Sequence, residues 1–217
     1  MGEDYNGSVS RKRSPWGVVA LVMLTGIAMM KNGVDVGLGP PQPAAAASLG
    51  RPNGETFVPL RTPKALSYAP AARVHIPSLK VDAPIMNVGL DPDGWIEAPP
   101  PEDPNMAGWY QNGIAPGQRG TAVVVGHVDN LSGPAVFYGL GSLEKGGRIE
   151  VSRFDGKTAV FEVYGVEVFS KENFPGSRVY GDTGYAELRV ITCGGGYSKT
   201  QGYDGNVVVF ARMVKSL

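Results

Sequence analysis

Cys193 is the only cysteine of this 217-residue chain, and it closes a strand-like run of mostly apolar residues, 188–192. Three glycines follow it directly. A thiol attacks an acyl carbon as the thiolate, which a nearby cation or imidazolium stabilises. An unpaired cysteine in this position is therefore either a nucleophile or a thiol that packs as a small apolar side chain.

The two histidines of the chain are the candidate proton-transfer groups. His127 follows the apolar segment 121–126 and enters a polar loop, where a strand scaffold presents catalytic side chains. His75 lies within a predicted strand, directly before Ile76 and Pro77, and we expect it to be structural. His127 alone fits either role, and its position relative to Cys193 favours catalysis.

Arg212 is the third candidate. Strand alternation places it on the same face as Val208 and Phe210, and a charge on an apolar face is costly unless it meets an anion. Its guanidinium could stabilise a thiolate or the oxyanion of an acyl-transfer intermediate. The alternative is an edge-strand arginine whose stem covers the core while its head reaches water.

Several other kinds of site are excluded or unsupported by composition. One cysteine and two histidines cannot assemble the usual zinc cluster, so we expect no metal and no cofactor. No glycine-rich phosphate motif opens a helix, and we interpret residues 194–196 as a flexible turn. Lys plus Arg and Asp plus Glu are both 20, so no global charge points to nucleic acid.

The elements that must position these residues are predominantly strands. The chain contains 31 Gly and 18 Pro, which punctuate short Val-rich segments in the manner of an all-β domain. We expect short helices in the connections 130–143 and 171–185, and a hairpin turn at Asp155-Gly156. The predicted strands are 74–77, 81–88, 121–126, 148–154, 158–169, 186–192 and 206–214.

The N-terminal third divides into three predicted segments before the domain at 73–217. Residues 1–14 carry Arg11-Lys12-Arg13, and 15–32 form an apolar membrane anchor with the N-terminus inside the cell. A cleaved signal peptide is the alternative, although the small residues 44–47 lie beyond a spacer. Residues 33–72 are rich in Pro, Gly and Ala and predict a stalk. The domain would then lie outside the cell membrane.

The order of His127, then Thr192-Cys193 at a strand end, then Arg212 on the final strand resembles the sortases. These are cysteine transpeptidases anchored outside Gram-positive cells. The segments that look most like the class F sortases of actinobacteria are 123–129, 191–195 and 206–211.

This resemblance implies a closed eight-stranded β-barrel with short connecting helices. It implies that the Cys193 thiolate attacks the Thr-Gly bond of a Leu-Pro-x-Thr-Gly-like sorting signal on surface proteins. His127 would protonate the leaving amine and activate the incoming amine of lipid II or peptidoglycan, and Arg212 would hold the threonyl oxyanion. Phe174 and Thr192 are the candidate substrate-binding residues, Thr192 as a second oxyanion donor through its backbone or its hydroxyl. Phe174 belongs to the connection 169–185, whose apolar residues would either pack the Leu-Pro of the signal or simply close the barrel.

Two other functions remain open at this point. One is a non-catalytic, membrane-tethered β domain that binds peptide or glycan, with Cys193 an inert thiol. The other is a cell-wall L,D-transpeptidase, although such enzymes keep His and Cys close in sequence, whereas His127 and Cys193 are widely separated.

Overall fold

The computed structural model describes residues 39–49 and 63–217. The predicted cytoplasmic segment 1–14 and the predicted anchor 15–32 lie outside these residues. Within the two described ranges, no helix is long and apolar enough to cross a membrane.

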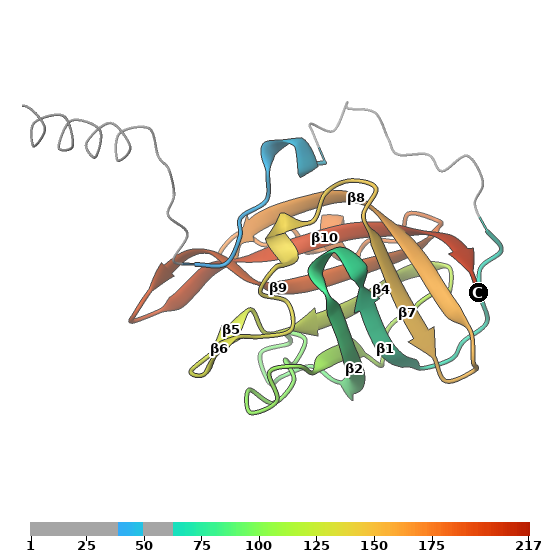
Figure 1. Ribbon diagram of the computed structural model, residues 1–217, viewed down its shortest axis with the longest axis horizontal. Helices are drawn as coiled ribbons and strands as arrows, with labels where there is room; N and C mark the ends of the chain where they lie inside the picture. Colours follow the sequence, from blue (N-terminus) through green and yellow to red (C-terminus); the bar gives the residue numbers. More distant parts are fainter. Residues whose placement is uncertain (1–38, 50–62) are drawn as a thin grey trace, which may run out of the picture. The chain divides into compact units, whose positions relative to one another are not determined.

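Eight strands close into a mixed barrel in the order β1-β2-β3-β4-β9-β10-β8-β7 (Figure 1). The β2–β3 and β4–β9 pairs are parallel, and the other neighbours are antiparallel. Two short strands, β5 and β6, form a separate hairpin. The strands are β1 Ala71–Ile76, β2 Val81–Val88, β3 Ala107–Tyr110, β4 Gly120–Gly126, β5 Asp129–Asn130, β6 Gly133–Pro134, β7 Arg148–Arg153, β8 Thr158–Ser170, β9 Ala186–Ser198 and β10 Gly202–Ser216.

The closed eight-stranded barrel agrees with the predicted all-β class, and the predicted strands correspond to seven of its elements. The Asp155-Gly156 turn joins β7 to β8, with Gly156 at a φ of 79°. The expected short helices in the two connections are η3 Leu140–Ser142 and α2 Gly176–Tyr180. The sequence prediction missed β3, together with the β5–β6 hairpin.

Alternating residues of β4, β9 and β10 supply two separate apolar clusters. Val190 and Val209 belong to a cluster with members on β1, β2, β7 and β8, which fills the barrel interior. Ile191 and Val208 belong to a second cluster, together with Val179 of α2. Because successive strand residues point to opposite faces, this second cluster lies on the outer face of the barrel. The connection that contains α2 covers it.

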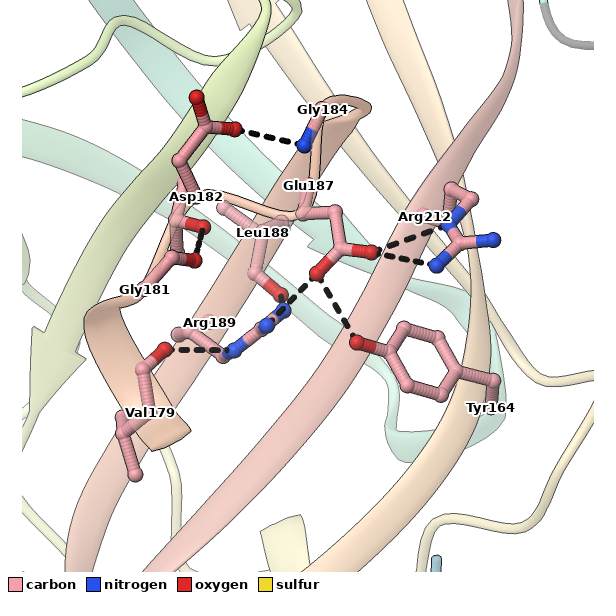
Figure 2. Close-up of polar contacts among 10 residues, drawn as sticks. Tyr164, Val179, Gly181, Asp182, Gly184, Glu187, Leu188, Arg189 and Arg212 are labelled. Atoms are coloured by element: carbon pink, nitrogen blue, oxygen red, sulfur yellow. Dashed lines mark hydrogen bonds and ion pairs between the residues drawn. The ribbon is translucent and has the colours of Figure 1, made fainter. Parts of the chain in front are cut away.

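A buried ion cluster lies at one end of this covered face (Figure 2). Glu187 accepts hydrogen bonds from Arg212 Nε at 3.0 Å and Nη2 at 2.7 Å, and from Arg189 Nη2 at 2.6 Å. The Tyr164 hydroxyl donates to the same carboxylate at 2.9 Å. Arg189 also donates from Nε to the carbonyl of Val179 in α2 at 2.9 Å. The cluster thus joins β8, β9 and β10 to the helix that covers them.

The charges in this cluster are almost completely removed from water. Glu187 is 0% exposed, Arg189 1% and Arg212 5%. Burial acts to raise the pKa of Glu187, but the guanidinium of Arg189 and the hydrogen bonds outweigh it, so this pKa lies below its ordinary value. The guanidinium of Arg189 also lies over the Phe210 ring, and that of Arg212 over the Tyr185 ring, at 4.5 and 4.1 Å from the centroids.

Residues 39–49, drawn in blue in Figure 1, pack against the barrel beside β8. They include η1 Ala45–Ala47, and Ala47 is only 3% exposed. The Ser48 hydroxyl and the Leu49 amide both donate to Glu167 of β8, at 3.3 and 3.1 Å. Arg178 of α2 donates to the same carboxylate at 2.9 Å. Part of the predicted stalk therefore lies on the domain.

We predict that Glu187→Gln lowers the free energy of unfolding by about 3 kcal/mol or more, because two buried guanidinium groups lose their counterion. Chemical denaturation monitored by circular dichroism measures this. The control is Glu150→Gln, whose carboxylate lies 3.6 Å from His75 Nδ1 at a half-exposed site. That change should cost less than about 1 kcal/mol. Equal, small effects of both substitutions would contradict a stabilising role for the cluster.

The lowered pKa of Glu187 also predicts a pH dependence. The folded state binds this proton less readily than the unfolded state, for which the ordinary value is 4.5. Its stabilising contribution is therefore fully present above that pH and is lost as the pH falls through the lower folded value. The free energy of unfolding, measured by denaturation from about pH 6 to about pH 3, should fall less steeply with decreasing pH in Glu187→Gln than in the wild type or Glu150→Gln. Parallel profiles would refute the assignment.

Candidate active site

A pocket of about 420 Å³ opens on the covered outer face of β4, β9 and β10. It contains both the predicted nucleophile and the predicted acid-base histidine. Its walls are mostly apolar, and among the lining residues that the structure describes only Lys171 has a permanent positive charge. The lining residues are Trp95, Ile96, Ala98, Val125, Gly126, His127, Lys171, Phe174, Tyr180, Ile191, Thr192, Cys193 and Asn206.

Parallel pairing of β4 with β9 brings His127 to Cys193. Val125 is the register partner of Ile191, so the residues two positions further on are His127 and Cys193. Neighbouring strands lie about 4.8 Å apart. Both side chains are half-buried at the same end of this strand pair. Residues 66 positions apart in sequence therefore reach one pocket.

Thr192 fixes the relation between these two strand segments. Its hydroxyl donates to the backbone carbonyl of Gly126 at 2.8 Å, in a buried position. Gly126 directly precedes His127, and Thr192 directly precedes Cys193. Thr192 lines the pocket, but its hydroxyl proton is used to join the strands. The side chain therefore positions the two reactive groups.

The His127 ring is held by the connection between β2 and β3. Its Nε2 lies 2.7 Å from the backbone carbonyl of Pro99. A carbonyl oxygen only accepts, so Nε2 must carry the hydrogen, and Nδ1 is the nitrogen left for proton transfer. Asn130, in the loop that begins at His127, donates to the carbonyl of Pro101 at 2.9 Å. This is a second hydrogen bond between that loop and the β2–β3 connection.

Cys193 is a free, half-buried thiol inside β9. The prediction that residues 194–196 form a turn is wrong, because β9 continues through them to Ser198 and pairs with β10. Gly195 adopts a φ of 86°, and a side chain there would collide with Asp204. The glycines let the hairpin backbones approach closely beside the thiol. The turn itself lies at residues 199–201.

The structure does not bring Arg212 to this pocket. In the β9–β10 register, Arg212 is the partner of Glu187, whereas Cys193 is the partner of Asn206. Arg212 lies six residue steps beyond Asn206 along the antiparallel strand, which is about 20 Å. Arg212 does lie on an apolar face and does meet an anion, as the alternation argument requires. That anion is the buried Glu187 carboxylate and not a thiolate or a substrate oxyanion.

Aromatic side chains from two connections form the apolar wall. Phe174 lines the pocket, and its ring lies 6.0 Å from that of Phe169 and 5.8 Å from that of Tyr180. Trp95 faces Phe174 edge-on at 6.3 Å and remains 51% exposed. Burial raises the pKa of the Tyr180 hydroxyl, so this wall is uncharged at neutral pH. An extended apolar peptide would find a complementary surface here.

Among the residues of this pocket region that sequence reasoning did not identify are Trp95, Pro99, Lys171 and Asn206. Trp95 follows the turn signal Asp91-Pro92-Asp93-Gly94, and an aromatic residue after such a turn was the available signal. Asn206 shares the strand face of Arg212 by alternation, but only the strand register places it beside Cys193. No sequence signal indicated the carbonyl of Pro99.

His75 lies apart from the pocket, on β1, with its side chain 48% exposed and near Glu150. Within residues 39–49 and 63–217, no group of three or more His, Cys, Asp or Glu is arranged to hold a metal ion. A thiol, an imidazole with one free nitrogen and an apolar cleft are the components of cysteine-dependent acyl transfer.

Comparison with known proteins agrees with this geometry. The model of the Sortase domain family matches residues 74–214. Similar solved structures include the SrtA sortase from Actinomyces oris, with 21% identity and a TM-score of 0.54 over 73% of this chain and 89% of that chain. Sortase C-1 from the same organism has 25% identity and a TM-score of 0.51, over 66% of this chain and 73% of that one.

Sortase A from Corynebacterium diphtheriae has 20% identity and a TM-score of 0.51, over 69% of this chain and 63% of that one. No curated protein matches the chain. The family match spans well over half of the sequence and includes both His127 and Cys193. The chain therefore belongs to the sortase family.

Proposed function

We propose that this sortase is a membrane-anchored cysteine transpeptidase that cleaves a Leu-Pro-x-Thr-Gly-like sorting signal and transfers the protein to a cell-wall amine. The observation that carries this proposal is the shared pocket of His127 and Cys193, built by parallel strands and walled by aromatic side chains. The aromatic wall suits the Leu-Pro part of such a signal.

In the first half of the reaction, the Cys193 thiolate attacks the threonyl carbonyl carbon and forms a tetrahedral oxyanion. The oxyanion collapses, the bond to the glycine nitrogen breaks, and a thioester remains on Cys193. His127 gives its Nδ1 proton to the departing amine. The Nε2 hydrogen bond to Pro99 persists throughout and leaves Nδ1 as the nitrogen that transfers the proton.

In the second half, an amine of lipid II or peptidoglycan attacks the thioester. His127 accepts a proton from this amine through Nδ1, and the thiolate leaves as the new amide bond forms. Both protonation states of the ring keep the hydrogen on Nε2. The histidine therefore returns to its starting state, ready for the next substrate, without rotating.

The cellular setting is part of the proposal. An anchor at residues 15–32, with basic residues before it, would place the domain outside the cell, where surface proteins meet their wall acceptors. The segments 123–129, 191–195 and 206–211 support assignment to the class F type. Each is a strand or strand end at or beside the pocket.

The test is turnover of a fluorogenic Leu-Pro-x-Thr-Gly peptide by the full chain in detergent, with the amine-exchanged product identified by mass spectrometry. Cys193→Ala should abolish cleavage, since no thioester can form. His127→Ala should lower kcat by about 10²- to 10⁴-fold, because the leaving amine loses its proton donor. His75→Ala, the matched histidine control, should retain wild-type activity.

Circular dichroism establishes that each variant folds. The absence of turnover across a library of sorting signals, with peptide binding retained, would support a non-catalytic binding domain. Activity in Cys193→Ala, or loss in His75→Ala with His127→Ala active, would overturn the residue assignment.

A further inference from the structure

Acyl transfer at Cys193 requires a donor for the developing oxyanion. Preorganised hydrogen-bond donors at that position supply one of the largest contributions to such catalysis. Arg212, the predicted donor, is paired with buried Glu187 about six residues along β10 from the strand position beside Cys193. Another group must therefore occupy the place beside the thiol.

Asn206 occupies that place. It is the direct cross-strand partner of Cys193 in the antiparallel β9–β10 ladder, and both residues line the pocket. Directly opposed residues of such a pair project to the same face, with Cβ atoms about 4.5 to 5.5 Å apart. A carbonyl carbon bonded to the Cys193 sulfur would hold its oxygen within reach of the Asn206 carboxamide.

The Asn206 backbone is rigidly placed. β10 is an interior strand of the barrel, and Asn206 pairs with Cys193 on one side and with Phe169 of β8 on the other. Among the described residues, none forms a hydrogen bond with its side chain, whose two N–H donors can therefore meet a ligand. A donor on a fixed strand costs little reorganisation when the oxyanion forms.

Lys171 is the other donor that lines the pocket. It lies just beyond the end of β8, and its side chain is exposed. A hydrated ammonium group on a flexible four-carbon stem must be immobilised before it can act as a fixed donor. The strand pairing therefore favours Asn206 over Lys171 as the fixed hydrogen-bond donor beside Cys193.

We propose that Asn206, and not Arg212, is a catalytic residue that donates its carboxamide N–H to the oxyanion formed at Cys193. This inference rests on the proposed function for its substrate. Its chemistry can still be tested without a sorting signal, because any acyl donor that reaches Cys193 forms the same oxyanion.

The experiment compares two reactions of Cys193 in the full chain. An activated aryl ester acylates the thiolate through a tetrahedral oxyanion and releases the aryl alcohol, which is followed by absorbance. A methyl thiosulfonate forms a disulfide by attack at sulfur, with no carbonyl and no oxyanion. Asn206→Ala should slow acylation by about 100-fold or more while the thiosulfonate rate stays within about threefold.

Two further variants define the donor. Asn206→Asp keeps the size but removes the N–H donors, so its acylation should be at least as slow as that of Asn206→Ala. Lys171→Ala should slow acylation far less than Asn206→Ala does. With a sorting peptide that the wild type cleaves, Asn206→Ala should lower kcat more than it changes KM.

Unchanged acylation in Asn206→Ala would overturn the inference, as would a large loss in Lys171→Ala alone. A wild-type thiol that reacts with thiosulfonate but not with the ester would also overturn it. If the ester results hold but no sorting peptide is cleaved, the proposed transpeptidation fails while the assignment of Asn206 stands.

Discussion

The antiparallel register of β9 and β10 determines which side chains meet on the covered outer face of the barrel. It pairs Arg212 with Glu187 at one end and Asn206 with Cys193 at the other, without interruption between them. The parallel register of β4 with β9 then brings His127 to the thiol. A shift of one residue in either pairing would turn these side chains to the opposite face of the sheet. Both the buried ion cluster and the reactive pocket depend on this constraint.

The two ends of this face have different roles: one stabilises the fold, and the other holds the Cys193 pocket. At one end, Glu187 neutralises buried guanidinium groups, and Arg189 extends from that cluster to the carbonyl of Val179 in α2. The same connection supplies Phe174 and Tyr180 to the pocket wall. The charged cluster therefore holds in place the connection that lines the pocket, although its own charged residues do not line the pocket. At the end of the face that holds Cys193, Lys171 is the only described lining residue with a permanent charge, which suits a neutral oxyanion donor and an apolar substrate segment.

Much of the barrel and the His127–Cys193 pair follow from sequence, because alternating Val-rich strands and a histidine at a strand end are local signals. Alternation also places Arg212 on the correct face. Alternation does not give the strand register, which depends on where the β9–β10 turn lies. The prediction of a turn at residues 194–196 ended β9 too early, because the strand continues to Ser198. The four-residue β3 contains a glycine and follows a proline-rich connection, so its strand signal was too weak to recognise. The distance between Arg212 and Cys193 is a consequence of long-range pairing that no local pattern encodes.

The most direct test is a crystal structure of the full chain with a Leu-Pro-Ala-threonine aldehyde bound to Cys193. The thiol adds to the aldehyde and forms a hemithioacetal, whose oxygen occupies the position of the oxyanion. We predict that this oxygen lies within about 3.1 Å of Asn206 Nδ2, with His127 Nδ1 facing the adduct and Arg212 still paired with Glu187. An oxygen that points away from Asn206, or an Arg212 guanidinium released from Glu187 to bind it, would contradict this account.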